Sequence, residues 1–133
     1  MDGQRYYIYE NGVVRPVSRP LWEYWKDENT KRLKVRETHF FRHGTSKFLG
    51  EVLTYFSGVD TSPETDEPCL WRTNFLGGAR FEAMKHTSEA KAREQHDVYV
   101  NWIISMLRKE GFRLLVIEID LSKVTKEQTW TQG

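Results

Sequence analysis

The stretch Leu33–Val59 reads LKVRETHFFRHGTSKFLGEVLTYFSGV and decides the fold. Two runs rich in β-branched and aromatic residues flank a break at Gly44 to Ser46, which is the pattern of an antiparallel hairpin. In the first run, one face carries Val35, Glu37, His39, Phe41 and His43, and the other carries Arg36, Thr38, Phe40 and Arg42. Both faces mix polar and apolar side chains, so neither reads as the solvent side of a sheet.

A second hairpin is predicted upstream, over Tyr6–Val17. Asn11 and Gly12 lie between its two strands and supply the positive φ angles of a two-residue type I′ turn. Pro16 cannot donate a hydrogen bond to a neighbouring strand. We therefore expect its strand to lie at a sheet edge or to end there.

The sequence predicts two helices. A short one begins after Ser18, a good capping residue, runs to about Arg32 and packs through its tryptophans. A long one is capped by Thr87 or Ser88 and ends at Gly111. Its apolar stripe comprises Ala92, His96, Tyr99, Ile103, Met106 and Leu107, broadened by Trp102.

The other segments add strands. Asp60–Pro68 is polar and punctuated by proline, which predicts an exposed loop. CLWRTNFL and ARFEAMKH follow it and are joined through Gly77-Gly78 as a hairpin. RLLVIEIDL predicts a last strand, with Leu115, Ile117, Ile119 and Leu121 on one side and Glu118 and Asp120 on the wet side.

These elements predict a single α+β domain over residues 1–133. Its antiparallel sheet has about six to seven strands built from hairpins and is packed by one long and one short helix. The tail from about residue 123 lacks an apolar period, and we expect it to be disordered or bound to a partner.

Composition narrows the classes of partner. The chain has 133 residues with 20 Lys and Arg against 19 Asp and Glu, and this near balance makes duplex nucleic acid an unexpected partner. No apolar run approaches the roughly 18 residues of a membrane span, so no membrane partner is expected. Cys69 is the only cysteine, which excludes an intrachain disulfide and favours a reducing, cytoplasmic location.

Charge is nevertheless uneven along the chain. Arg15–Lys47 carries nine Lys or Arg and four Asp or Glu, whereas Phe48–Trp71 carries five acids and no base. A local anion site is therefore compatible with the balanced total. Arginines and aromatic residues interleave on the predicted strands, a combination that can clamp phosphate and stack a base. The candidate ligand-binding residues are Arg36, Arg42, Tyr55, Trp71, Arg72 and His96.

Each of these residues also has a purely structural interpretation. Arginine and aromatic pairs across strands can simply stabilise a sheet. His96 falls on the apolar stripe of the long helix, where a histidine is more often a hydrogen-bonded core residue than a ligand contact. Both interpretations stay open at the level of sequence.

Catalytic and metal motifs are missing from the sequence: it contains no phosphate-binding glycine loop, no nucleophile elbow and no zinc-protease helix. His39 and His43 lie four residues apart on a predicted strand, about 13 Å, which is too far to share one ion. We therefore predict no catalytic residue, no metal ligand and no cofactor.

Four stretches of the chain resemble a family of short bacteriophage and prophage proteins. The stretches are WEYW, VLTYFSGVD, LWRTNFLGG and SEAKAREQH, and the family patterns are a tryptophan helix, V-S-T-V-F-L-G-L-D-H, L-F-E-T-M-V-F-G and T-W-E-E-A-x-x-G-H. The matched positions are Thr54, Phe56, Gly58, Asp60, Leu70, Thr73, Gly77, Ala92 and His96. The chain departs from the patterns at Thr61, Arg72 and Gln95. The resemblance implies a phage or prophage origin, a compact α+β fold and a host-cytoplasmic location, but no activity. It also implies that Thr54, Thr73 and His96 are neighbours.

Three functional hypotheses follow. The first is a homo-oligomeric phage protein that sequesters a small anionic, nucleotide-derived signalling molecule as a counter-defence. The second is an interaction protein that docks on and inhibits a host or phage protein through its Trp-rich first helix. The third is a small metal-dependent hydrolase or nuclease that uses His96 and a carboxylate such as Asp60.

Overall fold

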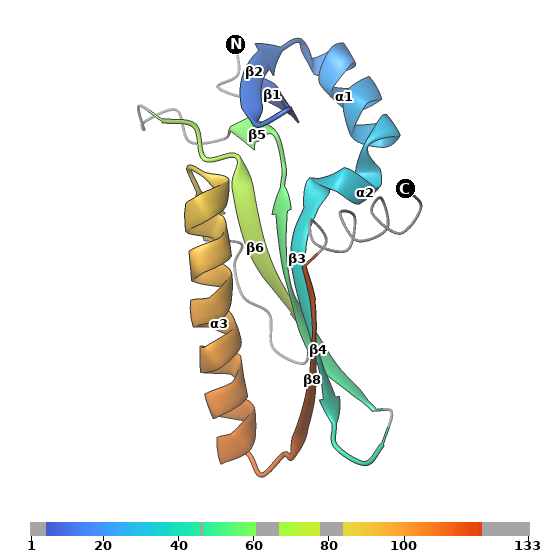
Figure 1. Ribbon diagram of the computed structural model, residues 1–133, viewed down its shortest axis with the longest axis vertical. Coiled ribbons are helices and arrows are strands. Elements are labelled where there is room, and N and C mark those ends of the chain that lie inside the picture. The colour runs from blue at the N-terminus through green and yellow to red at the C-terminus, as the bar shows by residue number, and fades with distance from the viewer. Residues whose placement is uncertain (1–4, 46, 61–66, 78–83, 121–133) are drawn as a thin grey trace, which may run out of the picture.

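A five-stranded antiparallel sheet with one long helix against it forms most of the molecule (Figure 1). The computed structural model describes residues 5–45, 47–60, 67–77 and 84–120. The sheet order is β7-β6-β4-β3-β8. Its strands are β3 (Lys34–Arg42), β4 (Phe48–Phe56), β6 (Trp71–Gly77), β7 (Met84–His86) and β8 (Leu114–Asp120), and the helix is α3 (Glu89–Lys109).

A second, smaller sheet lies at one end of the first (Figure 1). It has the order β2-β1-β5, and its strands are β1 (Arg5–Glu10), β2 (Val13–Val17) and β5 (Val59–Asp60). The helices α1 (Arg19–Glu28) and α2 (Thr30–Leu33) connect it to β3. The α+β class and the antiparallel hairpins are thus confirmed, with eight strands in two sheets where we expected six or seven in one.

The division into two sheets has a local cause at Gly58. This residue has φ +73°, a conformation that glycine adopts without strain. The chain turns there, so that Val59 and Asp60 leave the direction of β4 and pair with β1. The backbone N–H of Tyr7 donates to the carbonyl oxygen of Gly58 at 2.8 Å and fixes the turn against the small sheet.

The N-terminal hairpin is confirmed. Asn11 and Gly12 have φ angles of 53° and 77°, as a type I′ turn requires. Pro16 lies in β2, which is an edge strand of the small sheet.

The first helix is shorter than predicted, because it ends at Glu28 and does not continue to Arg32. Ser18 caps its start as expected, with its Oγ accepting a hydrogen bond from the N–H of Leu21. Asn29 ends it, since the side-chain amide of Asn29 donates to the carbonyl oxygen of Trp25 at 2.8 Å. Side chains that bond nearby carbonyls in this way compete with helix continuation.

Two hydrophobic clusters form the core, and each includes residues of α3 and of the main sheet, while the first also takes in Ile8 of β1 and Trp25 of α1. One contains Ile8, Trp25, Val35, Phe56, Leu70, Trp71 and Ala92. The other contains Phe40, Val52, Phe75, Val100, Ile103 and Leu107. Between them lies a layer of buried polar side chains, which we call the polar waist: Thr38, Thr54, Thr73 and His96.

The polarity of β8 is the reverse of the prediction. Glu118 and Asp120 lie on the side that faces α3, where they bond Arg36 and Arg93, although the side chain of Glu118 stays 52% exposed. Leu115 and Ile117 point away from α3 and are 46% and 43% exposed. Trp102, which we expected to broaden the packed stripe of α3, is 49% exposed, so that prediction is also wrong.

The sheet face that points away from α3 is called the open face below. It carries alternate residues of the paired strands: Glu37, His39, Phe41, Glu51, Leu53, Tyr55, Arg72, Asn74, Leu76, Leu115, Ile117 and Ile119. None of the helices in the described ranges combines the length and hydropathy needed to span a membrane. The predicted loop over Asp60–Pro68, the turn at Gly78 and the tail from residue 123 fall wholly or partly outside the described residues.

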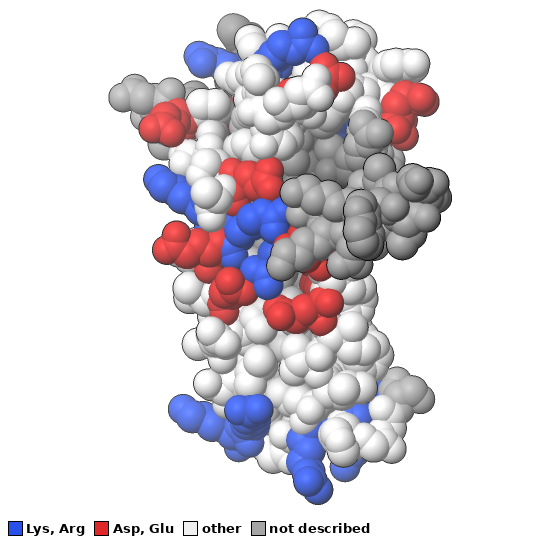
Figure 2. Space-filling model, in the orientation of Figure 1, with Lys and Arg blue, Asp and Glu red and all other residues white. Residues whose placement is uncertain are grey.

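The charged side chains form two groups on the face seen in Figure 2. Lysines and arginines gather at the end of the molecule where α3 stops and β8 begins. Acidic and basic side chains alternate across the middle of the same face.

Candidate functional site

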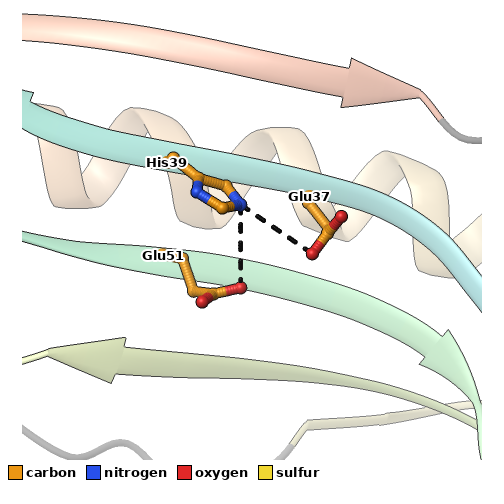
Figure 3. A group of neighbouring side chains, drawn as sticks. All are labelled: Glu37, His39 and Glu51. Atoms are coloured by element: carbon orange, nitrogen blue, oxygen red, sulfur yellow. Dashed lines mark ion pairs between the residues drawn. The ribbon is translucent and has the colours of Figure 1, made fainter.

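His39 of β3 lies between two carboxylates (Figure 3), whereas His43 belongs to the turn that follows the strand. Nε2 of His39 is 3.8 Å from a carboxylate oxygen of Glu37 and 3.8 Å from one of Glu51. The three ligand atoms lie within 4.8 Å of one another. Glu37 is two residues from His39 on the same strand face, and Glu51 is its partner on β4. Among the described residues, this is the group with the geometry to hold a metal ion.

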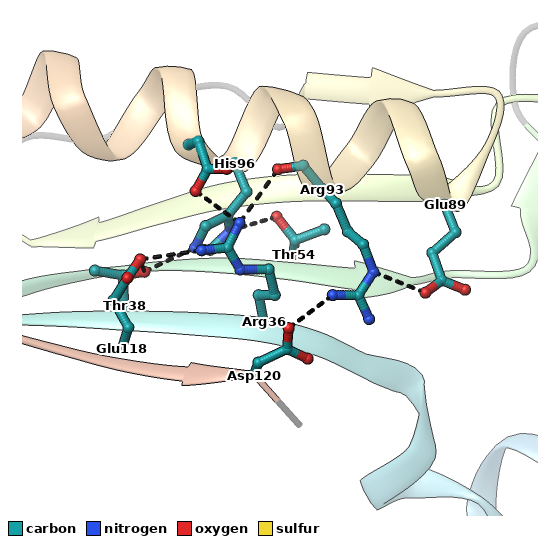
Figure 4. Close-up of polar contacts among 9 residues, drawn as sticks. Arg36, Thr38, Thr54, Glu89, Arg93, His96, Glu118 and Asp120 are labelled. Atoms are coloured by element: carbon teal, nitrogen blue, oxygen red, sulfur yellow. Dashed lines mark hydrogen bonds and ion pairs between the residues drawn. The ribbon is translucent and has the colours of Figure 1, made fainter. Parts of the chain in front are cut away.

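His96 occupies the centre of the polar waist and is fully buried (Figure 4). Its Nε2 lies 2.8 Å from Oγ1 of Thr38, and its Nδ1 lies 2.7 Å from Oγ1 of Thr54. The chain of hydroxyls continues from Thr54 to Thr73 at 2.7 Å, and from Thr73 to Nε2 of His86 at 3.1 Å. The expectation that Thr54, Thr73 and His96 are neighbours is therefore confirmed, and they form a buried hydrogen-bond cluster.

Burial, with a smaller contribution from the positive charge of Arg36, lowers the pKa of His96 from 6.5 to about 4. His96 is therefore neutral near pH 7, with each ring nitrogen at hydrogen-bond distance from a threonine. A neutral imidazole without solvent contact cannot take a proton from a substrate, so the arrangement is structural.

Arg36 also lies on the α3 side of the sheet, and carboxylates already surround it (Figure 4). Its guanidinium donates to Asp97 at 2.7 Å, to Glu118 at 3.0 Å and to the carbonyl oxygen of Arg93 at 3.3 Å. Arg93 continues the network, with bonds to Glu89 at 2.9 Å and Asp120 at 3.0 Å.

Four carboxylates face two guanidinium groups, so the network has an excess of negative charge. A phosphate would have to displace these acids in order to reach Arg36.

The structure does not bring the six predicted ligand residues together. Arg36 and His96 lie beneath α3, in the network and in the waist. Trp71 is 4% exposed and belongs to a hydrophobic cluster. Arg42 ends β3 at the far end of the sheet and is exposed. Tyr55 and Arg72 do meet, because they are register partners on β4 and β6.

Tyr55 and Arg72 line an open groove of about 360 Å³ at the end of the open face beside α1. Trp22 and Lys26 of α1 line the same groove. The indole N–H of Trp22 donates to the carbonyl oxygen of Ser57 at 3.2 Å, which ties α1 to the end of β4. Nζ of Lys26 lies 4.5 Å from the centre of the Trp22 ring, a cation–π contact that holds the ammonium at the rim.

The guanidinium of Arg72, which lines this groove, does not have a hydrogen-bond partner for every donor. Its Nε atom is buried and has no hydrogen-bond partner among the described residues. One terminal nitrogen makes only a long contact, 3.5 Å, to the carbonyl oxygen of Val59. Lys85 is the register partner of Arg72 on β7, so the sheet presents two cationic side chains side by side here. Two cations and two aromatic rings can bind an anion that carries a planar group.

Trp22 and Lys26, which line the groove, were not among the ligand-binding residues predicted from the sequence. Their signal was present, because Trp22 and Lys26 are four apart on a helix and therefore adjacent on its surface. The packing of α1 against the end of β4 could not be read from the sequence, since the turn at Gly58 sets it.

Comparison with known proteins adds no relative. No protein-family model matches the chain, no curated protein matches it, and no solved structure matches it.

Proposed function

We propose that this protein binds a small anionic molecule with a planar ring, such as a nucleotide, in the groove formed by Trp22, Lys26, Tyr55 and Arg72. The observation that carries the proposal is the buried, unpartnered Nε of Arg72 in a groove that two aromatic side chains line. A buried donor without a partner costs free energy unless a ligand or water satisfies it. A phosphate oxygen is a suitable acceptor for a guanidinium donor.

The rest of the groove supports the same class of ligand. Lys26 adds a second positive charge at the rim, and the rings of Trp22 and Tyr55 offer surfaces on which a base can stack. The four carboxylates that bond Arg36 and Arg93 belong to the network beneath α3 and are not among the residues that line the groove. The resemblance to short phage proteins extends the proposal to a biological role, in which binding sequesters a nucleotide-derived defence signal in the host cytoplasm.

The test is a thermal-denaturation screen of the full chain with adenosine, AMP, ADP, a cyclic dinucleotide and inorganic phosphate. We expect a nucleotide to raise the melting temperature, since a ligand at 100 times its Kd stabilises the folded state by about 2.7 kcal/mol. Arg72→Gln should abolish the shift. Arg42→Gln, at the exposed far end of β3, should keep it.

Native mass spectrometry on protein purified gently from cells gives the complementary result. A mass above an integer number of chains by a few hundred daltons supports a carried ligand. A bare mass, together with no shift from any compound in the screen, would remove the proposal.

A second candidate is an interaction protein, and the open face favours it. Leu76, Leu115 and Ile117 on this face are each more than two-fifths exposed. Exposed apolar patches of this kind mark interfaces. Of the two α1 tryptophans, Trp25 is buried and Trp22 bonds Ser57, so the support for this candidate comes from the open face. A stoichiometric host protein that Ile117→Glu fails to capture would favour this candidate over nucleotide binding.

A further inference from the structure

The centre of the open face holds an imidazole nitrogen that hydrogen-bonds nothing. Nε2 of His39 is buried and has no hydrogen-bond partner among the described residues. It points between the side chains of Glu37 and Glu51, which approach it from its own strand and from β4 (Figure 3). Both distances are 3.8 Å, beyond hydrogen-bond range. The nitrogen and the two carboxylates thus face a common point at ion-pair distance, with no hydrogen bond between them.

The surroundings hold these groups in place. The ring of His39 stacks on Phe41 with 6.4 Å between centroids, and it makes an edge contact with the ring of Phe48, with 6.2 Å between centroids. The side chains of Glu37 and Glu51 are only 15% and 19% exposed. Two carboxylates held close together and partly shielded from water repel each other unless a cation lies between them.

Lys34 offsets only part of the negative charge of Glu37 and Glu51. Its Nζ lies 3.7 Å from the Glu37 oxygen that faces His39, and its side chain is 45% exposed. The register places no described cation directly opposite Glu51 on β6, because its partner there is Leu76. A long, exposed lysine can turn into solvent when another cation occupies the cluster.

The donor set selects the class of ion. One imidazole nitrogen with two carboxylate oxygens suits zinc and related first-row transition ions, whereas magnesium and calcium prefer oxygen ligands alone. Ligand atoms on a tetrahedral zinc ion are about 3.4 Å apart. Each oxygen would therefore need to approach Nε2 by only about 0.4 Å, which rotation of a carboxylate provides.

We propose that Glu37, His39 and Glu51 form a binding site for zinc or a similar divalent transition-metal ion. The ion receives three ligands from the protein and keeps a position open toward the uncovered side of the sheet. The site is separate from the groove, because Glu51 lies four residues along β4 from Tyr55, a strand distance of about 13 Å.

The test is a zinc titration of the metal-free full chain in competition with a chromophoric chelator. We expect one zinc ion per chain, with no displacement by an equal concentration of magnesium. His39→Ala and Glu51→Gln should each weaken the affinity by at least about 10–100-fold, since they remove a direct ligand. His43→Ala is the matched control, because His43 is an exposed histidine on the same segment, and it should leave the affinity unchanged.

A spectroscopic readout separates this site from adventitious binding. On addition of zinc, the imidazole resonances of His39 should shift while those of buried His96 stay in place. Glu51→Gln keeps the size of the side chain, so it carries the test if His39→Ala does not fold. The proposal is overturned if zinc fails to bind stoichiometrically, or if His39→Ala and Glu51→Gln bind it as the wild type does.

Discussion

At the scale of single residues, the imidazole of His96 shows how burial and hydrogen bonding fix one protonation state. The unfolded chain takes up a proton at this residue near pH 6.5, whereas the folded chain resists protonation until about pH 4. Between these values the unfolded state binds more protons than the folded state, so acid favours unfolding. The stability linked to His96 is complete above about pH 7 and is lost as the pH falls from 6.5 toward 4.

We predict that the free energy of unfolding drops by about 2 kcal/mol between pH 7 and pH 5 through this residue. Urea denaturation across that range measures the drop. His96→Gln cannot be protonated and should flatten most of the dependence, while His43→Gln, in the exposed turn after β3, should preserve it. Burial lowers the pKa of His86 as well, so a small slope of the same sign should remain in His96→Gln. An unchanged slope in that variant would contradict the assignment.

At the scale of elements, the turn at Gly58 positions α1 relative to β4. A Cβ atom added there would lie 2.5 Å from the carbonyl oxygen of Tyr7 and 2.6 Å from the indole nitrogen of Trp22. Both contacts are closer than atoms can approach, and the φ angle of +73° is also unfavourable for a side chain.

Gly58→Ala should therefore destabilise the protein by about 2 kcal/mol or more. It should also displace Trp22, which would weaken nucleotide binding in the groove. Thermal denaturation and the change in Trp fluorescence measure the two effects. Gly44→Ala is the comparison, since Gly44 also has a positive φ but a Cβ there would meet nothing within 4 Å. If the two variants behave alike, backbone strain alone explains the loss.

Local sequence patterns predicted individual turns and helices better than they predicted how these elements pack against one another. The Asn11-Gly12 turn, the Ser18 cap and the apolar period of the long helix depend on nearby residues, and each is found as expected. The side of β8 that faces α3 could not be deduced, because alternation distinguishes two faces without saying which one is covered. Arg36 and Arg93 decide it, since they draw Glu118 and Asp120 beneath the helix.

The residues of the candidate sites could likewise be predicted from the sequence only in part. The pair of Tyr55 and Arg72 was among the predicted ligand residues, whereas Arg36 and His96 proved to be bonded within the core. A hairpin centred on Thr45 would have predicted that His39 and Glu51 face each other, because their numbers are symmetrical about it. The spacing of His39 and His43 along the chain does not reveal this pair, because His39 and Glu51 meet across two strands.

At the scale of the whole molecule, the helices of the described ranges cover one face of the five-stranded sheet and leave its other face open. The exposed side chains of Leu115 and Ile117 make that face apolar along β8, while exposed Leu76 lies on β6, on the other side of His39 and Glu51. A second copy can cover the apolar region with the same region of its own, as two-fold symmetric dimers do.

We therefore predict that the protein is a homodimer in solution, with a mass near twice the chain mass of 15.8 kDa. Light scattering measures this mass directly. Ile117→Glu should give the mass of a single chain, because it places a carboxylate beside Leu115 on the apolar surface of β8. Val98→Glu changes an equally exposed residue on the outer side of α3 and should leave the dimer intact. A wild-type protein of single-chain mass would refute the prediction.

The polar waist also has a consequence for the uniqueness of the fold. Ala92, His96 and Val100 follow one another at one-turn intervals along α3, each opposite its own layer of the sheet. If the helix slid by one turn, apolar side chains would still meet apolar side chains, but the imidazole would lie among phenyl rings, and the hydroxyls of Thr38 and Thr54 would lose their hydrogen-bond partner on α3. The polar waist thus fixes the position of α3 along the sheet. It contributes little to compactness, but it makes arrangements in which the helix is shifted along the sheet too high in free energy to be populated.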